Sequence, residues 1–204
     1  NGVDFDYFNI KETKEEARQK LGIISGKKII GYLGRLETVG KEKGVSEMIQ
    51  SFLAANEDAL LCVVGGPNRL ADKYRQEFNN NEKILFIGQV DYPLVPLYLR
   101  SFDAIIIPIP EERHAQTTSP IKLFEYLASG KVIIAPKIPS ITKYLNDNNS
   151  ILFDPNNAES LSEKIKTAIN DKGLVDKLSQ QSLLDAKSYS WRNRAKLILD
   201  FING

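Results

Sequence analysis

The sequence predicts a doubly wound α/β domain, in which helices cover both faces of a mostly parallel sheet of about six strands. Three observations support this prediction. Short apolar runs without polar alternation recur along the chain, as is typical of strands buried on both faces. Amphipathic segments with helical spacing lie between these runs. The 204 residues are enough for one large domain or two small ones.

The expected strands are the short apolar runs, and the expected helices are the segments in which apolar residues recur every three or four positions. The strands are 28–33, 59–64, 84–87, 104–108, 132–135 and 151–153. The helices between them are 45–56, 70–79, 94–101, 120–129 and 140–146. Three more helices, 158–170, 174–188 and 191–203, are expected after the last strand.

The first 26 residues fit this alternation poorly. N-G-V-D-F-D-Y-F looks like a loop, and 14–21 like a short helix. We expect 1–26 to be a linker and short helix from a missing N-terminal domain, and 27–188 to be the main domain. Residues 189–204 are expected to form a C-terminal helix that returns toward the missing domain or caps the sheet. The chain starts at Asn1 rather than Met, which suggests an excerpt of a longer protein.

The composition argues against several classes of protein. A net charge of +1 gives no global field to recruit nucleic acid or an acidic membrane. No apolar run approaches the roughly 20 residues of a membrane-spanning helix, and no signal peptide is visible. The one cysteine, Cys62, lies in an apolar run and is expected to be a buried thiol. The one histidine, His114, argues against a histidine metal site or a Ser/His/Asp triad and is expected at the surface.

The polar residues that follow the strands are the first candidates for a site, because open α/β sheets bind ligands at the carboxyl ends of their strands. The loop after the first strand carries Gly34, Arg35, Lys41, Lys43 and Gly44. Its cations suit a diphosphate, although a solvated charged loop has the same composition. The loop is neither a G-x-G-x-x-G nor a Walker A sequence.

The stretch T-S-P-I-K-L-F-E-Y-L-A-S-G combines a helix with a polar edge. Ser119 is a candidate cap, so Thr118 and Ser119 would lie at a free helix N-terminus, which favours phosphate. Lys122 and Glu125 are three residues apart on one face. They form either a simple ion pair or a ligand site. In the ligand site, the carboxylate accepts hydrogen bonds from ribose hydroxyls and the ammonium lies near a phosphate.

A second candidate motif is Asp4-Phe5-Asp6, which matches the D-x-D pattern of metal-dependent sugar transferases. The motif is only three residues long and lies in the expected linker. We therefore assign it no metal.

Several further segments, taken in order, carry a family resemblance. They are N-G-V-D, I-I-G-Y-L-G-R-L with the following K-G, V-V-G-G-P, F-I-G-Q-V, D-A-I-I-I-P, S-P-I-K-L-F-E-Y-L-A-S-G-K-V-I-I-A, I-L-F-D-P-N-N and the final S-W. With them the chain resembles the C-terminal, nucleotide-sugar-binding half of a GT-B glycosyltransferase of the glycosyltransferase group 1 (GT4) family. The resemblance covers nearly the whole chain and implies a Rossmann-like fold.

The resemblance also implies roles for residues of this sequence. Arg35 and Lys43 would bind the donor diphosphate, although Lys41 competes with Lys43 because the loop is longer than usual. Gln89 and Val90 would contact the base.

The family's E-x7-E motif places its second glutamate, here Glu125, on the ribose. Its first glutamate would fall at Thr117, and neither Glu111 nor Glu112 aligns with that position. This departure leaves the contact to the sugar open.

The implied reaction transfers a sugar from a nucleotide diphosphate sugar to an acceptor hydroxyl, with retention of configuration and without a required metal. The donor is a substrate, and no other cofactor is expected. The acceptor, a glycan or lipid-linked sugar, would bind on the missing domain. A cytoplasmic location is expected, with peripheral contact at the inner membrane face in the complete protein. Bacterial surface polysaccharide synthesis is the expected pathway.

Two other classes of protein compete with a transferase. One is a non-catalytic nucleotide- or sugar-binding module on the same fold, which the missing first glutamate favours. The other is a nucleotide-sugar epimerase or dehydrogenase, which would need a dinucleotide fingerprint and a Tyr-x-x-x-Lys pair. The chain contains no Tyr-x-x-x-Lys sequence, so this second class is disfavoured.

Overall fold

The computed structural model describes residues 2–23, 26–38, 40–110 and 121–203. Its main sheet has six strands in the order β5-β4-β1-β6-β7-β8, and each neighbouring pair is parallel. The strands are β1 (Lys28–Leu33), β4 (Ala59–Val64), β5 (Ile84–Gly88), β6 (Ala104–Ile106), β7 (Val132–Pro136) and β8 (Ile151–Phe153). All six lie where the sequence predicts them, with ends shifted by at most two residues, so the predicted fold class is confirmed.

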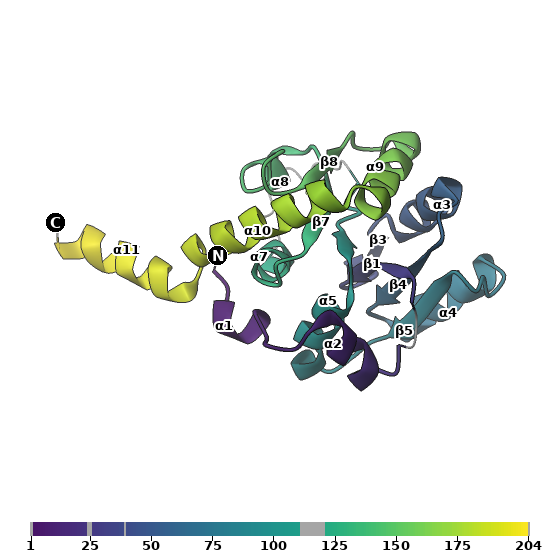
Figure 1. Cartoon of the computed structure of the whole chain (residues 1–204), viewed down its shortest axis with the longest axis horizontal. Helices are drawn as coiled ribbons and strands as arrows, with labels where there is room; N and C mark the ends of the chain where they lie inside the picture. Colours follow the sequence, from purple (N-terminus) through teal and green to yellow (C-terminus); the bar gives the residue numbers. More distant parts are fainter. Residues whose placement is uncertain (1, 24–25, 39, 111–120, 204) are drawn as a thin grey trace.

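Helices cover both faces of this sheet (Figure 1). One face packs against α5 (Val95–Ser101), α7 (Ile121–Ala128) and α8 (Pro139–Thr142). The other face packs against α3 (Val45–Ala55), α4 (Asn68–Glu77) and α9 (Ala158–Asn170). Adjacent strand residues divide between the two faces, as Ile29 and Ile30 do, and both are fully buried. Burial on both faces explains why the strands lack polar alternation.

The remaining helices lie at the two ends of the chain. They are α1 (Phe5–Phe8), α2 (Lys14–Lys20), α10 (Lys172–Ser188) and α11 (Trp191–Asn203), and a short 3-10 helix, η1 (Tyr92–Leu94), precedes α5. None of the described helices carries an apolar stretch long enough to cross a bilayer.

Two short elements correct the sequence prediction. The segment expected to be a loop contains α1, because the Asp4 carboxylate accepts a hydrogen bond from the Tyr7 amide and caps a single turn. The loop after β1 contains an antiparallel hairpin of β2 (Glu37–Thr38) and β3 (Lys41–Glu42). Neither is long enough to show a helical or strand period in the sequence.

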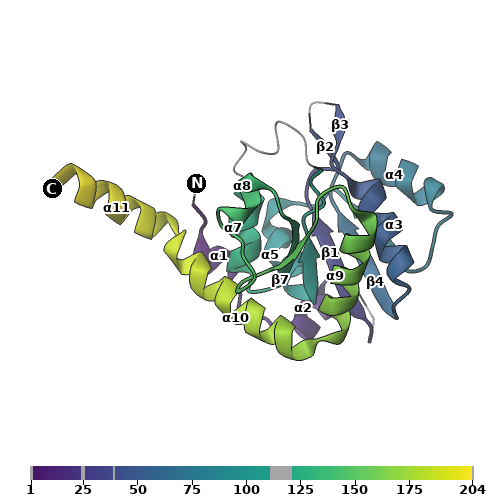
Figure 2. The same cartoon turned by 90° about the horizontal axis from the view of Figure 1, so that it is seen from above.

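The order of the strands sets where a ligand can bind. From β1 the chain proceeds to β4 and β5 on one side, and then crosses to β6, β7 and β8 on the other. The sheet therefore has its switch point between β1 and β6, and the helices that follow these strands, α3 and α7, pack on opposite faces of the sheet. The second view shows the hairpin β2–β3 at this end of the strands and α2 and α10 at the opposite end (Figure 2).

Asp103 joins the N-terminal segment to the sheet at the opposite end from the switch point. Its carboxylate, 6 % exposed, lies 2.8 Å from both Lys14 Nζ and Arg18 Nη2 and accepts the Ile29 amide at 2.7 Å. Burial alone would raise the pKa of Asp103, but the hydrogen bonds from Lys14 and Ile29 outweigh it and lower the pKa. The ionised carboxylate thus holds α2 against the sheet.

We expect Asp103→Asn to destabilise the protein by about 3 kcal/mol at pH 7, because the largely buried Arg18 and the nearby Lys14 lose the negative charge that pairs with them. A carboxyl group with a lowered folded pKa stabilises the native state above its unfolded value of about 3.9, and this contribution is lost as pH falls through the folded value. Denaturant unfolding at pH 7 and at pH 3 measures both effects. The matched control Asp147→Asn, at an exposed position, should change neither; equal stability of the two variants at pH 7 would refute this role.

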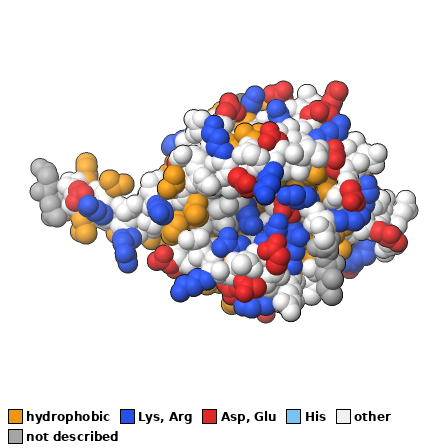
Figure 3. Space-filling model, in the orientation of Figure 1, with side chains coloured by type: hydrophobic (Ala, Val, Ile, Leu, Met, Phe, Trp, Pro, Cys, Tyr) orange, Lys and Arg blue, Asp and Glu red, His pale blue; other side chains and the backbone are white. Residues whose placement is uncertain are grey.

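The last helix, α11, extends away from the body of the domain (Figures 1 and 2). Its apolar side chains are exposed, among them Leu197 at 67 %, Phe201 at 88 % and Ile202 at 70 %. The space-filling view shows orange side chains on this projecting segment beside charged ones (Figure 3). Exposure of so many large apolar groups on one helix is unusual for a domain that is complete in itself.

Candidate functional site

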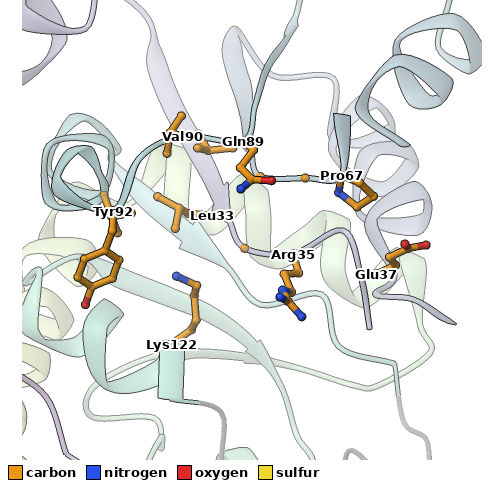
Figure 4. Close-up of a pocket in the computed structure, with 13 residues that line it drawn as sticks. Leu33, Arg35, Glu37, Pro67, Gln89, Val90, Tyr92 and Lys122 are labelled. Carbon is orange, nitrogen blue, oxygen red and sulfur yellow. The ribbon is translucent and has the colours of Figure 1, made fainter. Parts of the chain in front are cut away.

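A pocket of about 580 Å³ opens at the carboxyl ends of β1, β4 and β5. The loops after these three strands and the first turn of α7 form its walls (Figure 4). Its described lining comprises Leu33, Gly34, Arg35, Glu37, Val64, Gly65, Gly66, Pro67, Gln89, Val90, Tyr92, Val95 and Lys122. The size and position of the pocket suit a small organic ligand.

The loop that carries Arg35 is fixed by backbone hydrogen bonds to the loop after β4. The Gly34 amide donates to the Val64 carbonyl at 2.9 Å, and the Leu36 amide donates to the Gly66 carbonyl at 2.8 Å. The Tyr32 hydroxyl donates to the Arg35 carbonyl at 2.5 Å. The backbone of Arg35 is therefore held, while its exposed guanidinium points toward the pocket (Figure 4).

The side chains of Arg35, Lys43 and Lys122 place positive charges near the carboxyl ends of the strands. Lys43 is half-buried, and burial, followed by the positive charges of Arg35 and Lys122, lowers its pKa. Within the described part of the chain, neither Arg35 nor Lys43 forms an ion pair with a carboxylate. Uncompensated positive charge near a pocket favours an anionic ligand.

The competing lysine, Lys41, lies at a different place. It is exposed in the hairpin strand β3, whereas Lys43 is half-buried, and neither of the two lysines lines the pocket. The Lys43 amide instead donates to the Leu36 carbonyl at 3.1 Å, directly beside Arg35. The charges of Arg35 and Lys122 act on Lys43, while the preference for Lys43 over Lys41 as a diphosphate ligand stays a prediction.

Glu125 lies one turn below Lys122 on α7. It is 8 % exposed, and its carboxylate accepts a hydrogen bond from Lys122 Nζ at 3.1 Å. The neighbouring Tyr126 hydroxyl donates to the Leu33 carbonyl at the end of β1 and so anchors α7 to the sheet. The ion pair expected from the sequence is present, and it leaves the second carboxylate oxygen available to another donor.

Gln89 and Val90 follow β5 on the opposite wall of the pocket from α7. The backbone amide of Gln89 donates to the side-chain oxygen of Asn68 at 3.0 Å, and the Gly65 amide donates to the Gly88 carbonyl at 2.7 Å. The Gln89 side chain is exposed and reaches over the pocket (Figure 4).

Some sequence candidates cannot be placed. Thr117, Thr118 and Ser119, together with Glu111, Glu112 and His114, lie outside the described residues. Their predicted contacts to phosphate or sugar stay predictions.

Among the lining residues that the sequence analysis did not name as site residues are Glu37, Tyr92 and Val95. Glu37 forms an ion pair with Arg69 at the rim. The segment G-Q-V-D-Y after β5 was a signal for Tyr92, because a polar turn at a strand end in this fold faces the ligand.

Two other candidates have structural roles. Asp4 of the D-x-D sequence caps α1. Cys62 is buried as predicted, and burial raises the pKa of its thiol to about 12. Among the described residues, no three His, Cys, Asp or Glu side chains gather in a way that suits a metal ion.

Comparison with known proteins agrees with this architecture. The family described as "Glycosyl transferases group 1" matches residues 13–184. The capsular polysaccharide biosynthesis glycosyltransferase CapM of Staphylococcus aureus is 24% identical over 181 residues, which are 85% of this chain and 45% of CapM. The chain spans between 31% and 49% of the length of the curated relatives that it matches.

Solved structures show the same fold at low sequence identity. Anabaena HepE, in complex with UDP-glucose, has a TM-score of 0.81 and 17% identity, covering 100% of this chain and 56% of HepE. The C-terminal domain of the group 1 family glycosyl transferase LpcC from Francisella tularensis has a TM-score of 0.75 and 24% identity, covering 93% of this chain and 100% of that domain. The chain thus has the Rossmann-like fold of one half of a GT-B glycosyltransferase, and with the family match over most of its length it belongs to the glycosyl transferases group 1 family.

Proposed function

We propose that this chain is the donor-binding half of a retaining glycosyltransferase, which binds a nucleotide diphosphate sugar and supports transfer of the sugar to an acceptor hydroxyl. The observation that carries the proposal is the pocket at the carboxyl ends of the strands, which Arg35 and Lys122 line, with Lys43 bonded through its backbone to the neighbouring Leu36. The UDP-glucose named with HepE supports a nucleotide sugar, and CapM supports a role in bacterial surface polysaccharide. We place the reaction in the cytoplasm, at the inner membrane face.

The difficult step of such a transfer is the departure of the diphosphate. The bond between the anomeric carbon and the phosphate oxygen breaks, and a bond to the acceptor oxygen forms on the same face of the sugar. The acceptor proton passes to the departing phosphate. Arg35 and Lys43 would stabilise the growing phosphate charge, each contributing about 10²–10³ in rate. Because these cations meet the charge of the diphosphate, we propose that transfer of a hexosyl group requires no metal.

Glu125 would hold the ribose and thereby fix the donor in the pocket. Its buried carboxylate is ordered by Lys122 and by the anchored helix α7. A carboxylate accepts hydrogen bonds from both ribose hydroxyls, and removal of one such partner costs about 1.5–3 kcal/mol, or roughly tenfold or more in affinity.

We therefore expect Glu125→Ala to weaken UDP binding about tenfold and to reduce the preference for UDP over its 2′-deoxy analogue. Isothermal titration calorimetry with both nucleotides measures this, and GDP and ADP can replace UDP if they bind more tightly. The matched control is Glu163→Ala, which removes a similar three-residue ion pair with Lys166 on α9. Unchanged affinity in Glu125→Ala would count against the ribose role.

The proposed activity needs the acceptor half as well, so the chain alone is expected to bind the donor without transferring the sugar. An assay of sugar transfer by the complete enzyme separates a transferase from a non-catalytic binding module. Transfer that continues in the presence of EDTA supports the metal-independent reaction. A complete protein that binds the donor but neither hydrolyses nor transfers it would refute the proposed enzyme.

We also propose that α11 packs against the acceptor half, as part of an arrangement in which residues 1–26 connect the two halves. The Val3 amide donates to the Tyr189 carbonyl at 3.0 Å, and the Trp191 amide donates to the Val3 carbonyl at 3.1 Å. A segment that precedes Val3 would therefore lie close to the N-terminal end of α11. Trp191, Ala195, Ile198 and Ile202 share one face of this helix by their spacing.

This arrangement predicts different effects of one substitution in two proteins. Ile198→Gln should lower the melting temperature of the complete enzyme by at least about 2 °C, because it removes apolar contact between the halves. The same change in the present chain should have no effect, since Ile198 is 50 % exposed here. The control Lys196→Gln, on the polar face, should leave both proteins unchanged. Equal melting temperatures of the complete enzyme with and without Ile198→Gln would contradict the arrangement.

A further inference from the structure

The one aromatic side chain among the described residues that line the pocket is Tyr92, which is 55 % exposed. It begins η1, two residues after Val90, and Lys122 extends toward the space beside it (Figure 4). An exposed tyrosine is common on protein surfaces. This one differs because the residue lines the cavity and its ring is held in place by a separate element.

That element is α1, which lies 85 residues earlier in the chain. The Tyr7 ring stacks on the Tyr92 ring, with centroids 5.5 Å apart and planes 9° from parallel. The Tyr7 hydroxyl donates to the Tyr92 carbonyl at 3.3 Å, and the edge of Phe8 contacts Tyr92 at 6.2 Å between centroids. Phe8 is 3 % exposed and anchors α1 in the core.

The position of Tyr92 relative to Glu125 indicates which part of a ligand would meet it. Burial and then the negative charge of Glu125, followed by those of Tyr7 and Asp4, raise the pKa of Tyr92, so the phenol stays neutral. Tyr92 and Lys122 line the same pocket side by side (Figure 4), and Lys122 donates to the Glu125 carboxylate, so Tyr92 lies near the proposed ribose ligand. Tyr7 covers one face of the Tyr92 ring, and more than half of the residue remains open to solvent.

We propose that Tyr92 is a donor-binding residue that packs against the nucleoside of the donor, and that Tyr7 is a positioning residue that orders the Tyr92 ring. This inference rests on the proposed function and deepens it. A ring already ordered by stacking loses little conformational entropy when a base or ribose packs on it. An aromatic surface of this kind accepts any base, because every base has a π-face.

The test compares a ligand that has a nucleoside with one that lacks it. Calorimetry measures binding of the tightest of UDP, GDP and ADP, and of inorganic pyrophosphate, to the chain. Tyr92→Ala should lower the affinity of the chain for the nucleotide at least about fivefold, because the free energy of base–aromatic stacking corresponds to a change of this size. Its affinity for pyrophosphate should stay within about twofold, while Arg35→Ala should weaken both ligands. Tyr92→Phe keeps the ring and should bind like the wild type.

Tyr7 is tested by a double-mutant cycle. Tyr7→Ala should lower the affinity for the nucleotide but not for pyrophosphate. Tyr7→Phe keeps the stacked ring and should bind the nucleotide as the wild type does. Because Tyr7 acts through Tyr92, adding Tyr7→Ala to Tyr92→Ala should cause no further loss. Phe201→Ala, which removes an aromatic ring that is 88 % exposed on α11, is the control.

The outcomes separate the two proposals. If the wild-type chain binds pyrophosphate and a nucleotide, but Tyr92→Ala leaves the nucleotide affinity unchanged or weakens both ligands equally, the role of Tyr92 is wrong and the proposed function stands. If the wild-type chain binds none of these ligands, both proposals fail. Additive losses from Tyr7→Ala and Tyr92→Ala would overturn the positioning role of Tyr7.

Discussion

Arg35→Ala is expected to reduce sugar transfer by the complete enzyme at least about 100-fold. The guanidinium lies beside the pocket on a loop fixed by two backbone hydrogen bonds, and no carboxylate among the described residues neutralises it. Its position beside the pocket is therefore set by the fixed backbone, and its charge is available to an anion. Its bidentate donors would stabilise the departing diphosphate more than the bound donor, so kcat should fall more than KM rises.

Two variants control this experiment. Arg35→Lys keeps the charge but loses the fork of donors, and should retain part of the activity. Arg69→Ala removes an arginine that pairs with Glu37 at the rim of the same pocket, and should keep activity within about threefold because surface ion pairs contribute little. A rate of sugar transfer by Arg35→Ala within about threefold of the wild-type rate would contradict the proposed role of this residue.

Gly65→Ala is expected to destabilise the chain by about 3 kcal/mol, which for a domain of this size lowers the melting temperature by roughly 6–12 °C. Gly65 has a φ of +145°, and a Cβ atom there would lie 1.7 Å from the Gly34 carbonyl oxygen. The loops after β1 and β4 approach each other at this point, so the alanine must push them apart. The same displacement would widen the pocket and weaken nucleotide binding.

The control for this variant is Gly26→Ala. A Cβ atom at Gly26 would meet nothing within 4 Å, and its φ is not in the left-handed range. Its stability should change by no more than about 0.5 kcal/mol. Differential scanning calorimetry of the two variants decides the matter, and a Gly65→Ala protein as stable as Gly26→Ala would show that the approach of the two loops is not constrained.

The sheet and most helices were predictable because their signals are local and repeated. A strand such as β1 is buried on both faces, and its five buried residues, from Ile29 to Leu33, must be apolar or small whatever surrounds them. The convergence of Arg35, Gln89 and Lys122 also followed from the sequence, since parallel strands bring their carboxyl ends to one edge. Family resemblance supplied the roles that spacing alone left open.

What the sequence could not predict depends on contacts between distant residues. α1 is a single turn, and its formation needs the Asp4 cap and the burial of Phe8 rather than a periodic pattern. The Tyr7 and Tyr92 rings stack although the residues are 85 positions apart, and the sequence around neither tyrosine predicts this contact. The different exposure of Lys41 and Lys43 likewise depends on the hairpin β2–β3, which sets the direction of the chain after Arg35.

The central claim is that the pocket at the carboxyl ends of β1, β4 and β5 binds a nucleoside diphosphate. Mapping the amide NMR shifts of the chain during titration with UDP, GDP and ADP tests it most directly. The account predicts saturable shifts that cluster at Gly34–Arg35, Gly65–Gly66, Gln89–Val90 and the start of α7, and that disappear in Arg35→Ala. Saturable shifts at the opposite end of the sheet, around α2 and Asp103, or no shifts with any of the three nucleotides, would contradict it.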